Sequence, residues 1–234
     1  MSRVALVTGG NRGIGLSIAQ LLRAGGYTVV VGSRTGTAPD GLNAVMMDVA
    51  NTASIDAGFT EIEEKFGPVE ILIANAGMTR DTLLMRMSDE DIDEVLNTNL
   101  AGSIKLARRA LRSMLKARYG RIIFMSSVVG IIGSAGQVNY SAAKSGLIGA
   151  ARSLVREVGG RGITVNVLTP GFVNTDMTAD LGQERRAEIV SIVPLGRYAE
   201  PDEIATVVEF LVGDGAAYIT GAVIPIDGGL GMGD

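Results

Sequence analysis

Short runs of consecutive apolar residues alternate along the chain with stretches in which apolar residues recur every three or four positions. The first run spans residues 3–7, and Ile14, Ile18 and Leu22 follow it at helical spacing. An uninterrupted apolar run of this length is typical of a fully buried strand, and a spacing of three and four is typical of a helix. Strands that alternate with helices predict an α/β fold: a doubly wound parallel sheet of about seven strands with helices on both faces.

The same alternation continues to the end of the chain. The segment 174–200 has weaker periodicity, and we find no repeat, low-complexity tract or linker, so residues 1–234 are expected to form one domain. Strands are expected at 3–7, 28–31, 44–47, 70–74, 122–125, 163–168 and 222–226, and helices at 14–24, 52–66, 89–117, 138–158 and 202–212.

Two residue types are absent, and their absence limits the chemistry. The chain has neither histidine nor cysteine, which excludes Ser-His-Asp hydrolysis, thiolate nucleophiles and His- or Cys-ligated zinc, so no metal site is expected. Proton transfer must then use Tyr, Lys, Asp or Glu. The net charge of −4 argues against nucleic-acid binding.

The ends and the uncharged segments of the chain bear on its location. The amino terminus lacks the apolar core of a signal peptide. Residues 122–143 carry no charge, but they contain many glycines, serines and amides, which argues against a membrane span. A cytoplasmic protein is therefore expected.

A glycine-rich turn separates the first expected strand from the first expected helix. Glycine lets the backbone pass close to a pyrophosphate, and the amino end of the helix supplies amide donors. A glycine motif alone is about as often a simple turn, but its position between a strand and a helix favours a dinucleotide site. The residues concerned are Gly9, Asn11, Arg12, Gly13, Ile14 and Gly15.

The second expected strand ends at Ser33 and Arg34, where an NAD site usually has an acid that binds the ribose 2′-hydroxyl. Residues 1–39 contain no acid, and an arginine here suits a 2′-phosphate. The sequence therefore predicts NADP(H) in preference to NAD(H), although Arg34 could also be a solvated surface residue.

Tyr140 and Lys144 are four residues apart, so both side chains lie on one face of a helix. A neighbouring ammonium favours tyrosinate and would lower the Tyr140 pKa from about 10. Such a pair is common on helix surfaces. Here it indicates a functional site, because Ser126 and Ser127 end the preceding strand, at the sheet edge that also carries the glycine-rich turn.

Together these motifs resemble the short-chain dehydrogenase/reductase family over essentially the whole chain. Within it, residues 83–87, 127–130, 162–167, 170–178 and 218–229 are similar to the 3-oxoacyl-[acyl-carrier-protein] reductases of fatty acid synthesis. Ala74 departs from the family, which often has asparagine there. The motifs are the turn at 8–15, Asn75-Ala76-Gly77, Asn99, Ser127, Tyr140-x-x-x-Lys144 and Pro170-Gly171.

The resemblance implies a Rossmann-like fold and a role for each matching residue. Tyr140 protonates the substrate oxygen, Ser127 binds that oxygen, Lys144 binds the nicotinamide ribose and lowers the Tyr140 pKa, and Asn99 supports a proton-relaying water. The implied cofactor contacts are Asp48 and Val49 at the adenine, Asn75, Ala76 and Gly77 at its ribose, and Pro170, Gly171, Val173 and Thr175 at the nicotinamide.

The chain also has a basic stretch. Residues 105–121 contain seven basic residues and no acid: Lys105, Arg108, Arg109, Arg112, Lys116, Arg118 and Arg121. A solvated face and a docking surface for an acidic partner are both possible interpretations. The resemblance implies that Arg118 and Arg161 contact an acyl carrier protein bearing the 3-oxoacyl thioester, and the other residues are interpreted as solvated.

The resemblance has two further implications for shape. It implies a homotetramer in which the helices at 89–117 and 138–158 pack across one interface. It also implies a substrate loop near 174–200, for which we expect a mobile lid, with an ordinary surface helix as the alternative.

Two other functions stay open. One is a related ketoreductase that acts on acetoacetyl-CoA, polyketide or other ketone substrates. The other is a non-catalytic NADP(H)-binding regulator, which should lack part of the Ser-Tyr-Lys-Asn set. All four residues are present in this chain.

Overall fold

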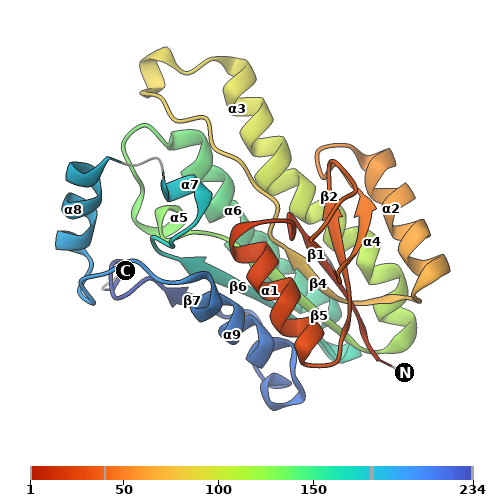
Figure 1. Cartoon of the computed structure of the whole chain (residues 1–234). Helices are drawn as coiled ribbons and strands as arrows, with labels where there is room; N and C mark the ends of the chain where they lie inside the picture. Colours follow the sequence, from red (N-terminus) through yellow and green to blue (C-terminus); the bar gives the residue numbers. More distant parts are fainter. Residues whose placement is uncertain (1, 40, 180–181, 233–234) are drawn as a thin grey trace.

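One sheet of seven parallel strands organises the computed structural model, which describes residues 2–39, 41–179 and 182–232 (Figure 1). The strand order β3-β2-β1-β4-β5-β6-β7 confirms the doubly wound fold. The order reverses between β1 and β4, which is where such sheets bind ligands. The strands are β1 (Val4–Thr8), β2 (Thr28–Ser33), β3 (Asn43–Met46), β4 (Val69–Ala74), β5 (Gly120–Met125), β6 (Ile163–Pro170) and β7 (Val223–Ile226).

Helices cover both faces of the sheet, so the central strands are buried on both sides (Figure 1). All five residues of β1 and all eight of β6 are buried, which explains why these strands are continuous apolar runs in the sequence. One face is covered by α2 (Thr52–Lys65), α4 (Gly102–Ala117) and α6 (Val138–Val158), and the other by α1 (Gly13–Ala24) and α9 (Pro201–Val212).

The prediction of one continuous helix over residues 89–117 is wrong. The structure divides this segment into α3 (Asp89–Leu96), a π turn (Asn97–Ala101) and α4. The Asn99 side chain donates to the Val95 carbonyl oxygen at 3.0 Å, so a side-chain amide uses a backbone acceptor and the helix widens locally. Such widened turns are frequent at functional sites.

Several short helices connect the main elements, and these were not expected individually. The helix α8 (Gln183–Ile192) buries only Ile189 among its described residues, which explains the weak periodicity of 174–200. The other short elements are η1 (Leu84–Arg86), α5 (Val129–Ile132), η3 (Gly159–Arg161), α7 (Asp176–Ala179) and η4 (Asp214–Ala216). Within the described ranges, no helix combines the length and apolarity that crossing a bilayer requires.

Candidate active site

The turn between β1 and α1 exposes its backbone, because its glycines have no side chains; this turn is called the cradle. A side chain at Gly15 would place its Cβ 2.4 Å from the Gly9 carbonyl oxygen and 2.5 Å from the Asn75 amide nitrogen, so only glycine fits. Gly9 and Gly13 have φ angles of +66° and +53°, which also favour glycine. Asn11 and the exposed Arg12 precede α1, and Ile14 lies in its first turn. Free amides of the first helical turn therefore face the end of β1.

Thr8 and Asn75 tie the ends of β1 and β4 together beside this turn. The Thr8 hydroxyl accepts from the backbone amides of Asn75 and Ala76, at 3.1 Å each, and the Asn75 side chain donates to the Thr8 carbonyl oxygen at 3.0 Å. Thr8 therefore has a structural role at the site that its sequence motif did not predict. The available signal was a polar residue that ends an otherwise apolar run.

The expected adenine end of the site lies along β2 and β3. Ser33 is buried, and its hydroxyl donates to the Thr37 carbonyl oxygen at 3.0 Å. Arg34 follows it and is exposed. Asp48 accepts from the Ala50 amide at 3.0 Å, and the adjacent Val49 is buried.

Ser127, Tyr140 and Lys144 come together where β5 ends and α6 begins. The Lys144 ammonium is buried, donates to the Met125 carbonyl oxygen at 2.7 Å and lies 5.6 Å from the centre of the Tyr140 ring. The Ser127 hydroxyl accepts from the Val129 amide at 3.2 Å. Ser126, which had no assigned role, donates to the Lys144 carbonyl oxygen at 2.8 Å and joins the strand end to the helix.

Burial sets the protonation of the tyrosine and lysine. It raises the pKa of Tyr140 to about 12, although the Ser127 hydroxyl acts in the opposite direction. It also lowers the pKa of Lys144 to about 8. The Tyr140 pKa therefore lies above its ordinary value and not below it as expected, because desolvation of the phenol dominates. Tyr140 is a neutral phenol near pH 7 and holds a proton that it can donate.

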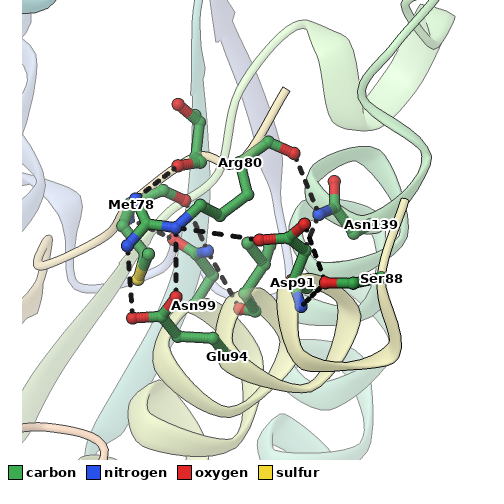
Figure 2. A network of polar contacts seen from close by, with 9 residues as sticks. Met78, Arg80, Ser88, Asp91, Glu94, Asn99 and Asn139 are labelled. Carbon is green, nitrogen blue, oxygen red and sulfur yellow. Dashed lines mark hydrogen bonds and ion pairs between the residues drawn. The ribbon is translucent and has the colours of Figure 1, made fainter. Parts of the chain in front are cut away.

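Asn99 is completely buried in the π turn, and both donors of its side-chain amide bond to backbone oxygens. It donates to the Met78 carbonyl oxygen at 2.8 Å and accepts from the Met78 amide at 3.1 Å (Figure 2). A Cβ on Gly77 would lie 2.5 Å from the Asn99 side-chain oxygen and 3.4 Å from the Lys144 nitrogen. The loop after β4 thus passes between these two side chains.

The segment expected at the nicotinamide begins where β6 ends at Pro170. The Gly171 amide donates to the Ile226 carbonyl oxygen at 3.0 Å, and Val173 is buried. A Cβ on Gly13 would lie 3.4 Å from the Thr175 methyl group. This segment therefore closes over the glycine-rich turn.

Arg118 and Arg161 lie together, but on the edge of the sheet opposite the site. A Cβ on Gly162 would be 2.6 Å from the Arg118 carbonyl oxygen, so the two loops touch. Both arginines are exposed and precede β5 and β6, whereas Ser127 follows β5. At about 3.3 Å per residue, the six residues of β5 separate the two edges by roughly 20 Å.

Two arginines of the basic stretch are buried, so the expectation that they are solvated is wrong. Arg109 is 8% exposed and makes two hydrogen bonds of 2.9 and 2.7 Å to Glu63. Arg121 is 4% exposed and stacks on Tyr119. Lys105 is half-buried and donates to Asn97 at 3.1 Å.

Comparisons with known proteins match nearly the whole chain to one family of reductases. A family model described as enoyl-(acyl carrier protein) reductase matches residues 9–231. The chain is 49% identical over 233 residues to 3-oxoacyl-[acyl-carrier-protein] reductase MabA of Mycobacterium avium, covering 100% of this chain and 91% of the relative. It belongs to the short-chain dehydrogenase/reductase family. FabG of Escherichia coli (strain K12), also a 3-oxoacyl-[acyl-carrier-protein] reductase, is 47% identical over 241 residues, or 98% of each chain.

Membership of the short-chain dehydrogenase/reductase family implies a nicotinamide dinucleotide as the cofactor. The residues present fit this group. The cradle at Gly9 and Gly15 has no room for side chains, which leaves the backbone accessible to a pyrophosphate. Thr175, in the segment that follows β6, lies beside the same turn.

Proposed function

We propose that this chain reduces 3-oxoacyl-[acyl-carrier-protein] to 3-hydroxyacyl-[acyl-carrier-protein] with NADPH, in cytoplasmic fatty acid synthesis. The observation that carries the proposal is the position of the half-buried Tyr140 beside Ser127 and the buried Lys144, at the carboxyl edge of the sheet. Full-length identities of 49% and 47% to two reductases with this printed activity support the choice of substrate.

Each residue then has a defined task. A reduced nicotinamide, when bound, supplies the hydride to the ketone carbon. Ser127 hydrogen-bonds the ketone oxygen and stabilises the negative charge that develops there. Tyr140 donates its proton to that oxygen as the hydroxyl forms. Lys144 binds the nicotinamide ribose, and Asn99 supports the water through which Tyr140 regains its proton.

The preference for NADP(H) rests on Arg34, which is exposed at the end of β2, and on the lack of acids in residues 1–39. We expect Arg34→Asp to weaken NADPH binding by about tenfold, or about 1.4 kcal/mol, and to leave NADH binding unchanged or improved. Fluorescence titration with both cofactors measures this, with the exposed Arg152→Asp as the control. Equal loss for both cofactors would contradict the assignment.

The carrier-docking proposal must account for the position of Arg118 and Arg161 on the opposite edge. We infer that they serve the site of a neighbouring subunit in a homotetramer. In support, α4 exposes the large apolar side chains of Ile104 and Leu115, which a contact between subunits would bury. Charge reversal at both arginines should raise KM for the carrier-bound substrate and not for a small thioester; equal effects on both would defeat the docking proposal.

Residues 174–200 are proposed as a lid over the substrate. Their buried core among the described residues is small, consisting of Ile189, Val193 and Tyr198. The partly buried Phe172 and Leu230 pack against it. This small core lets the segment move without disturbing the sheet.

The deciding experiment is the loss of NADPH absorbance with acetoacetyl-carrier protein, run beside acetoacetyl-CoA and with NADH in place of NADPH. Crotonyl-carrier protein is included because the matching family model is described as an enoyl reductase. We expect the fastest turnover with acetoacetyl-carrier protein and NADPH. Faster turnover of crotonyl-carrier protein would indicate enoyl reduction, equal turnover of the CoA substrate a broader ketoreductase, and tight NADPH binding without turnover a regulator.

A further inference from the structure

The first turn of α6, which carries Tyr140, is held by a buried amide that the proposed mechanism does not use. Asn139 is 2% exposed, and buried amides of native proteins almost always have hydrogen-bond partners. Its side-chain oxygen accepts from the Tyr140 backbone amide at 2.7 Å. That amide lies in the first turn of the helix, where backbone donors have no partner within the helix.

The other end of the Asn139 side chain reaches two different segments. Its nitrogen donates to the Arg80 carbonyl oxygen and to the Asp91 carbonyl oxygen, at 3.2 Å each (Figure 2). Arg80 lies in the loop after β4, and Asp91 lies in α3. One side chain therefore joins the loop, α3 and the amino end of α6, with all of its partners on the backbone.

The same loop is fixed to Asn99 two residues earlier, at Met78. The Arg80 side chain adds a contact to α3 through Glu94 at 3.1 Å, and Ser88 caps α3 through the Asp91 amide at 3.1 Å. Figure 2 shows Asn99 bonded to Met78 and Asn139 bonded to Arg80, two residues further along the same loop. Asn99 is thus connected through the backbone of residues 78–80 and the Asn139 side chain to the Tyr140 amide.

From this geometry we propose that Asn139 is a positioning residue: it fixes Tyr140 relative to Asn99 and Lys144. The proposal rests on the roles given to Tyr140 and Asn99 in the proposed function. It adds that the proton donor is placed by a side chain that touches neither substrate nor cofactor. A misplacement of about 1 Å can cost about 10²-fold in rate, so loss of this bridge should act on turnover rather than on binding.

We expect Asn139→Ala to lower kcat for acetoacetyl-carrier protein by about 10- to 100-fold, with KM and NADPH affinity within about threefold of the wild-type values. Asn139→Asp retains the shape and the acceptor for the Tyr140 amide, but its second carboxylate oxygen faces the carbonyl oxygens of Arg80 and Asp91, so it should lower kcat at least as much as Asn139→Ala. Asn139→Ser, which is small and uncharged, serves as the second variant if Asn139→Ala folds poorly, with the same expected loss. The control is Gln137→Ala, which removes an exposed hydrogen bond of 2.7 Å between the same helix start and Asp81, and should leave kcat within about twofold.

A double-mutant cycle separates positioning from general stability. In a Tyr140→Phe background, Asn139→Ala should cause no further loss of kcat, because the proton donor that it places is gone. An equal fold-loss in both backgrounds, or a wild-type kcat in Asn139→Ala, would overturn the proposal.

A second readout does not depend on activity. Amide hydrogen exchange of residues 138–144 in the protein without cofactor should speed up by about tenfold in Asn139→Ala and stay unchanged in Gln137→Ala, and unchanged exchange in both would also overturn the proposal. If the wild-type protein fails to reduce acetoacetyl-carrier protein, the proposed function is wrong, while the exchange result still decides whether Asn139 fixes this turn.

Discussion

The two walls of the site are held in different ways. The wall formed by residues 76–82, α3 and the start of α6 is fixed by the buried amides of Asn99 and Asn139, which bond to backbone. The wall formed by residues 172–200 packs around the small cluster of Ile189, Val193 and Tyr198, and partly exposed side chains such as Arg186 make several of its side-chain contacts.

This difference corresponds to two tasks. Leaving a buried amide without a partner costs about 1–3 kcal/mol, whereas an exposed polar pair contributes about 0–1 kcal/mol. The first wall therefore keeps one geometry, which proton transfer requires. The second can shift at little cost, as the proposed lid requires.

The largest expected effect comes from removing the proton donor of the fixed wall. We expect Tyr140→Phe to lower kcat by about 10²- to 10⁴-fold, the usual contribution of a general acid, with NADPH affinity retained. Steady-state kinetics with acetoacetyl-carrier protein and a cofactor titration check this. Wild-type turnover in the variant would remove Tyr140 from the mechanism.

The next effect concerns the burial of Lys144, whose pKa is lowered to about 8. Between this value and its ordinary value, the unfolded chain binds more protons than the folded one, so the free energy of unfolding rises with pH. We expect a gain on the order of 2 kcal/mol from pH 8 to 9.5, and its loss in Lys144→Met. Urea unfolding at both pH values measures it; the exposed Lys116→Met should keep the wild-type gain, and a gain retained in Lys144→Met would contradict the burial effect.

The smallest effect tests the looser wall. Arg186 bonds to Asn174 and stacks on Tyr198 at 4.4 Å, while the neighbouring Arg185 pairs with Glu188 on the surface of α8. Removing Arg186 should cost about 1 kcal/mol of local stability. Arg186→Ala should then speed hydrogen exchange of residues 183–192 by about fivefold and change kcat by less than threefold, and Arg185→Ala should do neither. If Arg186→Ala lowered kcat as much as Tyr140→Phe does, this wall would also be required to keep one geometry.

The sequence by itself determined the sheet, the positions of its strands and the spacing of the candidate site. Apolar runs and helical spacing are local properties, so the strands and the helices α1, α2, α6 and α9 were predicted with small errors at their ends. The same holds for the glycine-rich turn and for the pairing of Tyr140 with Lys144 on one helix face. The place of Arg118 and Arg161 on the opposite edge was also implicit in the order of the elements, because both precede a strand.

Only the tertiary structure decided how these residues behave. The π turn depends on where the Asn99 amide finds its partners, and the burial of Arg109 depends on Glu63, which is distant in sequence. The direction of the Tyr140 pKa depends on how much water packing removes from the phenol. The bridge from Asn139 to Arg80 and Asp91 joins three segments. Such effects arise from contacts between distant parts of the chain, and no local pattern of residues encodes them.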